Sequence, residues 1–214
     1  MLTFHHVSKA YSKSGIRKVI FDDLTFEFPK NRNVAIMGKN GAGKSTMMRL
    51  LAGSEPPDSG QVFRGLRVSW PLGFTGGFNG TMTGLENIRF VARIYGQDTE
   101  QVVDYVSDFA ELGPSIRLPV KTYSTGMRAR LAFGLSMAID FQVYLIDEIT
   151  AVGDDSFKRK SNAVFKNKLE SSQIIMISHS EATIKSYCDC GLLLDDGHIT
   201  FFDDVSDLVA AYKC

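Results

Sequence analysis

Residues 38–45 carry glycine, lysine and serine at spacings that suit phosphate binding. They read Gly-Lys-Asn-Gly-Ala-Gly-Lys-Ser and fit the pattern G-x-x-x-x-G-K-[ST] at every fixed position. The glycines let backbone N–H groups close around phosphate oxygens, because no Cβ stands in the way. Lys44 can reach the β- and γ-phosphates of a nucleotide, and the Ser45 hydroxyl can ligate Mg²⁺. The segment therefore predicts a phosphate loop rather than a glycine-rich turn with a surface lysine.

The residues around this loop favour a strand before it and a helix after it. Residues 34–37 are apolar and strand-like, and residues 46–52 are helix-forming until Gly53 ends the run. A helix that starts at the loop points its partly positive N-terminus at the bound anion. Strand, loop and helix in this order are the context that the motif requires.

Two adjacent carboxylates, Asp147 and Glu148, follow the apolar run at residues 143–146. A carboxylate at the carboxyl end of a parallel strand faces the ligand crevice of an α/β sheet. We expect Asp147 to hold Mg²⁺ through water, and Glu148 to orient and polarise the attacking water. Alone the pair would indicate a solvated loop, and the phosphate loop upstream favours the functional interpretation.

Three further positions have side chains that could contact a nucleotide. Ser124 and Gly126 stand at the start of an expected helix and can bind an anion, the structural alternative being an ordinary N-cap. His179 follows the apolar run at residues 174–177 and could hydrogen-bond a γ-phosphate. Tyr11 offers a flat face for adenine, although most tyrosines are packing residues.

The composition is that of an ordinary globular chain of 214 residues, with 44% hydrophobic and 22% charged residues. Lysine plus arginine balance aspartate plus glutamate at 24 each, so no global charge favours nucleic acid or an anionic membrane. No apolar run approaches the roughly 20 residues of a membrane span, and no signal peptide is expected. Three cysteines, an odd number, argue against a disulfide framework and suit a reducing cytosol.

The elements that must position these residues alternate between strands and helices. Residues 61–80 are expected to be irregular and residues 84–139 to be helical. Strands are expected at residues 4–7, 19–28, 143–146 and 174–177. A hairpin is expected at residues 192–202 and a terminal helix at residues 205–212. This order predicts an α/β fold with a mainly parallel sheet and a helical insertion.

Together these motifs resemble an ATP-binding cassette, the motor domain of ABC transporters, over essentially the whole chain. The resemblance implies a P-loop NTPase fold with a mainly parallel core sheet, an N-terminal antiparallel β-subdomain and a helical insertion. It implies a single domain over 1–214 with a helical subdomain at roughly 75–140. The residues that it assigns to ATP are Tyr11, Gly38, Lys39, Asn40, Gly41, Ala42, Gly43, Lys44, Ser45, Thr46, Ser124 and Gly126. It assigns Ser45 and Asp147 to Mg²⁺, Lys44, Glu148 and His179 to catalysis, and Asp154 to a loop that crosses a dimer interface.

The departures from the family pattern are informative. Residues 123–127 read Y-S-T-G-M where the family has L-S-G-G-Q, and Ile149 replaces the proline after the catalytic glutamate. No glutamine lies between Gln61 and Gln97, so the usual glutamine-containing loop has lost its glutamine. In its place is a P-L-G…G-G-F-x-G…T-G-x-E-N run, similar to cassettes of capsular polysaccharide exporters. Trp70, Phe74 and Phe78 of that run are candidate contacts with a membrane partner, or packing residues.

The resemblance implies a head-to-tail homodimer that clamps ATP and drives a multi-span membrane permease. The chain would be a peripheral protein on the cytoplasmic face of the inner membrane and export lipid-linked capsular polysaccharide, with no nucleic-acid partner. Because only 35 residues follow His179, we expect a hairpin and a terminal helix there and no separate glycan-binding domain, which favours the capsular type. The alternatives are a cassette for O-antigen, teichoic acid or another lipid, a soluble ABC ATPase, and a phosphoryl-transfer kinase.

Overall fold

The computed structural model describes residues 1–13, 15–72, 77–147 and 155–213. The chain divides into two compact units, each formed from separate stretches of sequence. The first contains Met1–Pro71, Phe141–Ile149 and Ser172–Cys214, and the second contains Leu72–Asp140 and Thr150–Ser171. The second unit thus includes residues 150–171 in addition to the range of 75–140 expected for the helical subdomain.

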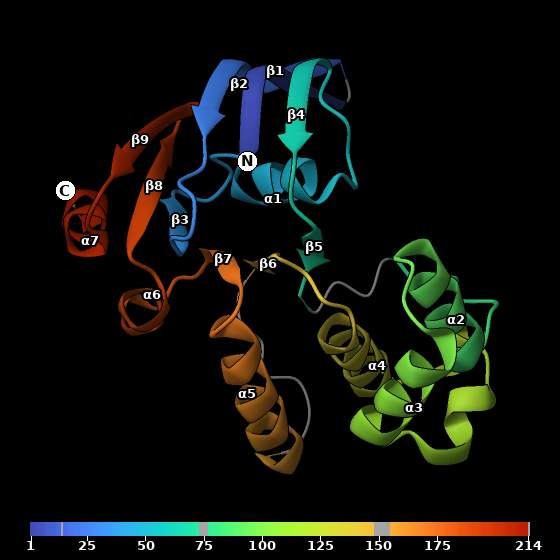
Figure 1. Cartoon of the computed structure of the whole chain (residues 1–214). Coiled ribbons are helices and arrows are strands. Elements are labelled where there is room, and N and C mark those ends of the chain that lie inside the picture. The colour runs from blue at the N-terminus through green and yellow to red at the C-terminus, as the bar shows by residue number, and fades with distance from the viewer. Residues whose placement is uncertain (14, 73–76, 148–154, 214) are drawn as a thin grey trace. The chain divides into compact units, whose positions relative to one another are not determined.

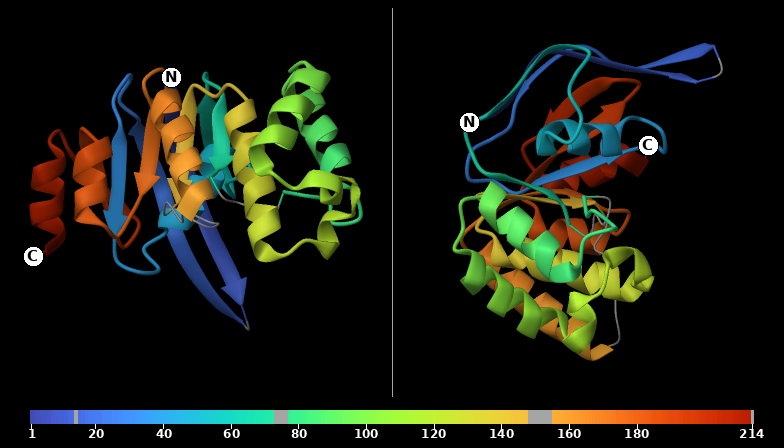
Figure 2. Two further views of the ribbon diagram at one scale, coloured as in Figure 1. Left: turned by 90° about the horizontal axis from the view of Figure 1, so that it is seen from below. Right: turned by 90° about the vertical axis from the view of Figure 1, so that its right-hand side faces the viewer.

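A three-stranded antiparallel sheet in the order β2-β1-β4 begins the first unit. Its strands are β1 (Leu2–Lys13), β2 (Ile16–Glu27) and β4 (Ser59–Arg64). β1 and β2 pair from Thr3 opposite Glu27 to Lys13 opposite Ile16, with register shifts between Phe4 and Ala10. Figure 2 shows these two strands running side by side along their whole length. The antiparallel N-terminal sheet agrees with the sequence prediction, although both strands extend beyond the expected ranges.

A six-stranded sheet in the order β5-β6-β7-β3-β8-β9 forms the centre of the first unit. The first five strands are parallel and only β9 is antiparallel, as the mainly parallel prediction requires. The strands are β3 (Val34–Gly38), β5 (Val68–Pro71), β6 (Val143–Asp147), β7 (Gln173–Ile177), β8 (Cys190–Asp195) and β9 (His198–Phe202). Gly38, Asp147 and Ile177 therefore lie at the carboxyl ends of neighbouring parallel strands.

The expectation of irregular structure over residues 61–80 was wrong, because β4 and β5 lie there. β4 is largely exposed and has no apolar alternation, and its pairing with β1 gives it an extended conformation. At Gly60 an added Cβ would lie 2.0 Å from the carbonyl oxygen of His6, so this pairing needs glycine. β5 is only four residues long and pairs with β6, which lies far away in the sequence.

Helix α1 (Lys44–Ala52) packs against both sheets and forms the centre of the hydrophobic core. Figure 1 shows it between the antiparallel sheet and the strands of the larger sheet. Its fully buried side chains are Met47, Met48, Leu50 and Leu51. The helix ends at Gly53, as predicted, and Gly53 adopts the left-handed conformation. Helices α6 (Glu181–Tyr187) and α7 (Val205–Lys213) complete this unit, and α7 packs against β3, β8 and β9.

The second unit is helical, as expected for the insertion. It contains α2 (Gly84–Ile94), α3 (Thr99–Ala110), the 3₁₀ turns η1 (Gly113–Arg117) and η2 (Val120–Thr122), α4 (Thr125–Ala138) and α5 (Asp155–Leu169). Phe109 joins three of these helices through ring contacts with Phe133 at 5.8 Å and Phe157 at 5.4 Å. Across the described ranges of both units, no helix is long and apolar enough to cross a bilayer.

Candidate functional site

Strand β3 ends at Gly38, and the loop that follows leads directly into α1 at Lys44. At Gly38 an added Cβ would lie 2.3 Å from the carbonyl oxygen of Leu194 on β8, so no other residue fits there. Gly43, the N-cap of α1, has a φ of 107° and leaves only 2.6 Å between an added Cβ and the Ile20 side chain. The two glycines let the backbone turn tightly against β2 and β8, and the first N–H groups of α1 start at this turn.

The Lys44 side chain curls back over the loop that precedes it. Its Nζ donates hydrogen bonds to the carbonyl oxygens of Gly38 at 2.6 Å and Lys39 at 3.0 Å. Only 9% of Lys44 is exposed, so these contacts hold the ammonium inside the curve of the loop. A phosphate bound by the loop would meet a positive charge that is already in place.

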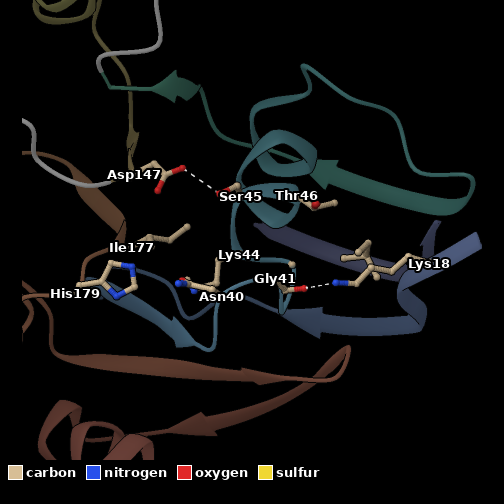
Figure 3. A pocket seen from close by; sticks show the side chains of 11 residues that line it. Lys18, Asn40, Gly41, Lys44, Ser45, Thr46, Asp147, Ile177 and His179 are labelled. Atoms are coloured by element: carbon tan, nitrogen blue, oxygen red, sulfur yellow. Dashed lines mark hydrogen bonds between the residues drawn. The ribbon is translucent and has the colours of Figure 1, made fainter. Parts of the chain in front are cut away.

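Ser45 and Asp147 bring a hydroxyl and a carboxylate together from two elements. Ser45 lies in the first turn of α1 and Asp147 ends β6, and Oγ and Oδ2 are 3.4 Å apart (Figure 3). Mg²⁺ prefers oxygen ligands and commonly uses one or two protein oxygens together with water and substrate phosphates. The described residues contain no group of three or more His, Cys, Asp or Glu side chains that could hold a metal by themselves. The oxygen pair therefore suits Mg²⁺ bound jointly with a phosphate.

A cavity of about 420 Å³ lies over this loop and is large enough for several phosphate groups. Its walls are Lys18, Ile20, Asn40, Gly41, Gly43, Lys44, Ser45, Thr46, Asp147, Ile177 and His179 (Figure 3). The structure thus gathers Asn40, Gly41 and residues 43–46 of the predicted loop and helix start, together with Asp147 and His179, around one space. His179 comes from the loop after β7, at the same sheet edge as Asp147.

Lys18 is a cavity residue that the sequence analysis missed. It lies on β2, and its Nζ donates a hydrogen bond to the carbonyl oxygen of Gly41 at 3.0 Å. Figure 3 shows the side chain extending from the strand toward the loop. Lys18 lies one residue before the strand expected at 19–28, and its reach to the loop depends on how β2 packs against the loop. Lys18 adds a second cation to the wall formed by Lys44.

Tyr11 lies on β1 in a network of charged side chains. Its hydroxyl donates to Glu55 Oε2 at 2.7 Å and accepts from Arg49 Nη2 at 2.9 Å, while Lys9 Nζ lies 3.0 Å from Glu55 Oε1. Burial alone would raise the pKa of Glu55, but the hydrogen bonds from Arg49, Tyr11 and Lys9 lower it to about 2. Tyr11 is not among the described residues that line the 420 Å³ cavity. Its role in adenine binding stays a prediction.

Ser124 and Gly126 belong to the second unit, and the structure places them at the start of α4. Ser124 is the N-cap of the helix and its Oγ accepts a hydrogen bond from the Met127 backbone N–H at 3.2 Å. The ordinary capping role considered as the alternative is therefore present. Ser124 is exposed and Gly126 partly exposed, so a ligand could reach both.

Several predicted residues lie outside the described residues, namely Phe74, Glu148, Ile149 and Asp154. Of the candidate partner contacts, Trp70 is partly buried and its ring meets that of Phe141 edge to face at 5.2 Å. Trp70 therefore does pack within the first unit. Phe78 is partly exposed.

Known proteins resemble this chain in both sequence and fold. A family model described as ABC transporter matches residues 21–151, well over half of the chain. The polysialic acid transport ATP-binding protein KpsT of Escherichia coli is 47% identical over 100% of this chain and 99% of its own length. The capsule polysaccharide export ATP-binding protein CtrD of Neisseria meningitidis serogroup B is 44% identical over 100% of this chain and 99% of its own length.

A solved structure shows that the fold is shared as well. The ATP-binding cassette MJ0796, described in a dimeric post-hydrolysis state bound to ADP and Pi, aligns with a TM-score of 0.74 at 18% identity. The alignment covers 96% of this chain and 99% of that one. The family match, the full-length relatives and the geometry of the phosphate loop agree. The chain belongs to the ABC transporter family.

Proposed function

We propose that this chain is the ATP-hydrolysing subunit of an exporter that moves lipid-linked capsular polysaccharide across the cytoplasmic membrane. The observation that carries the proposal is the full-length similarity, at 47% and 44% identity, to proteins named for polysialic acid transport and capsule polysaccharide export. The cavity over the phosphate loop supplies the chemistry that such a subunit needs. The proposal therefore joins a substrate class taken from the relatives to a site built from this chain's own residues.

In this proposal the phosphate loop binds the triphosphate through backbone N–H groups and the N-terminus of α1. Lys44 exchanges its contacts with the Gly38 and Lys39 carbonyls for phosphate oxygens and stabilises the charge that develops on them. Ser45 and Asp147 would hold Mg²⁺, which neutralises phosphate charge when bound. Each of these roles requires only the side chains that already face the cavity.

Glu148 and His179 would act on the water and the γ-phosphate. Glu148, one residue after Asp147, orients and polarises the attacking water, and His179 hydrogen-bonds the γ-phosphate. His179 already lines the cavity, which supports this assignment. Both residues would act on the side of the cavity formed by the ends of β6 and β7.

A second copy of the chain would complete each site. Ser124 and Gly126 stand exposed at the start of a helix, where backbone N–H groups are available to an anion. In a head-to-tail dimer they would close over ATP held by the phosphate loop of the other copy. The dimer would dock on a multi-span permease as a peripheral protein at the inner face of the membrane, and ATP-driven closure would drive export.

The test is to purify the tagged chain from native membranes in mild detergent and to identify what accompanies it. We expect one multi-span membrane protein in stoichiometric amount, together with ATP hydrolysis that the Glu148→Gln variant loses while it still binds ATP. Recovery of ribosomal or nucleic-acid partners would contradict the transport proposal. Hydrolysis at the wild-type rate by Glu148→Gln would contradict the catalytic assignment alone.

To test the substrate class, the gene would be deleted in its own host and replaced with the Lys44→Ala variant. We expect lipid-linked polysaccharide to accumulate inside the cell and capsule to disappear from the surface. Normal capsule with a defect in another surface glycan would contradict the capsular assignment and leave the ATPase proposal intact.

A further inference from the structure

Tyr123, the residue immediately before Ser124, is buried beneath the start of α4. Only 3% of it is exposed, and its hydroxyl donates a hydrogen bond to the carbonyl oxygen of Ser115 in η1 at 2.8 Å. Burial raises the pKa of Tyr123, and a hydrogen bond from the Gly84 backbone opposes this rise. The hydroxyl therefore stays protonated at neutral pH and bridges η1 and the first residue of α2.

Gly84 leaves the space that the Tyr123 hydroxyl occupies. A Cβ added at Gly84 would lie 2.5 Å from the Tyr123 oxygen and 2.9 Å from the carbonyl oxygen of Ile116. The φ of Gly84 is not positive, so the requirement for glycine comes from this close approach. The glycine of the T-G-x-E-N run and the tyrosine of the Y-S-T-G-M run thus form one contact.

The segment that carries Gly84 is itself held by side-chain hydrogen bonds. Thr83 and Glu86 form a capping box at the start of α2. Asn87 is 2% exposed, and its side chain accepts from the Asn79 N–H at 2.9 Å and donates to the Thr83 carbonyl oxygen at 2.9 Å. Because these contacts fix the backbone on both sides of Gly84, the position of Tyr123 is fixed as well.

Backbone hydrogen bonds join the same two segments a second time. The Val120 N–H donates to the Met82 carbonyl oxygen at 2.9 Å, and the Lys121 N–H donates to the Gly80 carbonyl oxygen at 2.8 Å. The residues before α2 and the residues before α4 therefore form one hydrogen-bonded unit. Ser124, the N-cap residue of α4, follows this hydrogen-bonded unit directly in the chain.

We propose that Tyr123, through its contact with Gly84, is a positioning residue that sets the start of α4 and so aims Ser124 and Gly126 at ATP bound by a second copy. The inference rests on the proposed dimer, and it adds a residue that touches neither ATP nor the reacting atoms. It predicts a specific defect, because the nucleotide cavity of the first unit contains none of these residues.

The test uses full-length protein carrying Glu148→Gln, in which ATP is expected to drive stable dimerisation. Tyr123→Phe removes only the hydroxyl, and Gly84→Ala fills the space beside it. Tyr105→Phe is the matched control, because it removes a hydroxyl from a tyrosine on α3 that is 37% exposed. Dimerisation would be followed by sedimentation as ATP is titrated, and ATP affinity of the dilute monomer by fluorescence.

We expect Tyr123→Phe to raise the ATP concentration needed for dimerisation by about fivefold, as loss of a buried hydrogen bond would. Gly84→Ala should raise it by about tenfold or more, and Tyr105→Phe should stay within about twofold. Monomer affinity for ATP should not change in any of the three.

Three outcomes would overturn the inference. If Tyr123→Phe dimerises like its parent, the contact does not position α4 and the proposed dimer stands. If monomer affinity for ATP falls in parallel with dimerisation, the contact is only structural. If the Glu148→Gln parent itself does not dimerise with ATP, the proposed dimer fails and this inference fails with it.

Discussion

The phosphate loop of the first unit and the start of α4 in the second unit both present a helix N-terminus, but different interactions fix their shapes. At the phosphate loop, Gly38 and Gly43 bring backbone against neighbouring strands at distances that exclude any Cβ. At the start of α4, the Tyr123 hydroxyl bonds to Ser115, and backbone hydrogen bonds tie the preceding residues to the segment before α2. That segment is held in turn by Asn87 and the Thr83 capping box. Close backbone approach fixes the first region, whereas the second depends on hydrogen bonds together with the close approach of Gly84 to the Tyr123 hydroxyl.

The difference explains how each motif relates to its family pattern. A loop defined by close backbone approach tolerates no larger residue, so residues 38–45 fit the general pattern at every fixed position. A helix start defined by hydrogen bonds can change residues together, provided that their partners change too. In this chain Tyr123 and Gly84 are such partners, because a larger residue at position 84 would take the space of the Tyr123 hydroxyl.

The largest expected effect concerns the cation of the phosphate loop. Lys44→Ala should lower the ATP hydrolysis rate by about 100-fold or more, because the charge that meets the phosphates is lost. Lys30→Ala, at an exposed position in a turn, is the control and should hydrolyse ATP normally. A Lys44→Ala variant that retains half of the wild-type rate would show that the loop backbone alone carries the site.

Alanine at one glycine in each region tests the comparison directly. Gly43→Ala forces a side chain into a φ of 107° and against Ile20 at 2.6 Å, so unfolding free energy should fall by about 2–4 kcal/mol. Gly126→Ala meets no atom closer than 3.9 Å and should keep or gain stability, by up to about 1 kcal/mol. Urea denaturation measures the unfolding free energy of both variants. Equal losses in the two variants would contradict the proposed difference between the phosphate loop and the start of α4.

For Gly126→Ala we expect a stable fold but weaker ATP-driven dimerisation. Its Cβ would stand where a second copy's ATP is proposed to approach, so ATP-driven dimerisation should weaken although the fold is intact. Normal dimerisation would show that the backbone of Gly126 is not part of the closed site.

A third expected effect is a loss of folding stability that appears only at acidic pH. The pKa of Glu55 is lowered from 4.5 to about 2 in the folded protein, so its contribution to stability is complete above pH 4.5. As pH falls from there toward 2, the unfolded chain takes up the proton first and about 2 kcal/mol is lost. Glu55→Gln should reduce the dependence of the unfolding free energy on pH between 4.5 and 2. Urea denaturation at several pH values measures this dependence. Glu100→Gln, whose side chain is 71% exposed, should leave it unchanged.

The smallest expected effect belongs to Lys18. Lys18→Met removes the hydrogen bond to the Gly41 carbonyl but keeps the length of the side chain. Because the contact is exposed to solvent, ATP affinity should fall only about two- to fivefold, with the hydrolysis rate at saturation unchanged. Steady-state kinetics would separate the two, and a loss of maximal rate would place Lys18 closer to the reaction than the structure suggests.

The predictable parts of this molecule are those fixed by local chemistry. The strand that ends at Gly38, the helix that begins at Lys44 and the carboxylate of Asp147 at the end of β6 followed from short motifs, because backbone geometry leaves those positions little choice. β4 could not be predicted, since its exposed residues have no apolar alternation and its pairing with β1 decides its conformation. The reach of Lys18 and the contacts of the Tyr11 hydroxyl depend on packing between distant segments, which no local pattern encodes.

The contacts of Lys44 with two carbonyl oxygens have a consequence for how fast and how tightly a ligand can bind. A free lysine side chain loses roughly 2 kcal/mol of conformational entropy when it becomes ordered. In this chain much of that loss already occurs on folding, since Gly38 and Lys39 hold the ammonium. Arrival of a phosphate then requires only an exchange of hydrogen-bond partners over a short path. Binding at this position should therefore carry only a small entropic penalty from the lysine side chain.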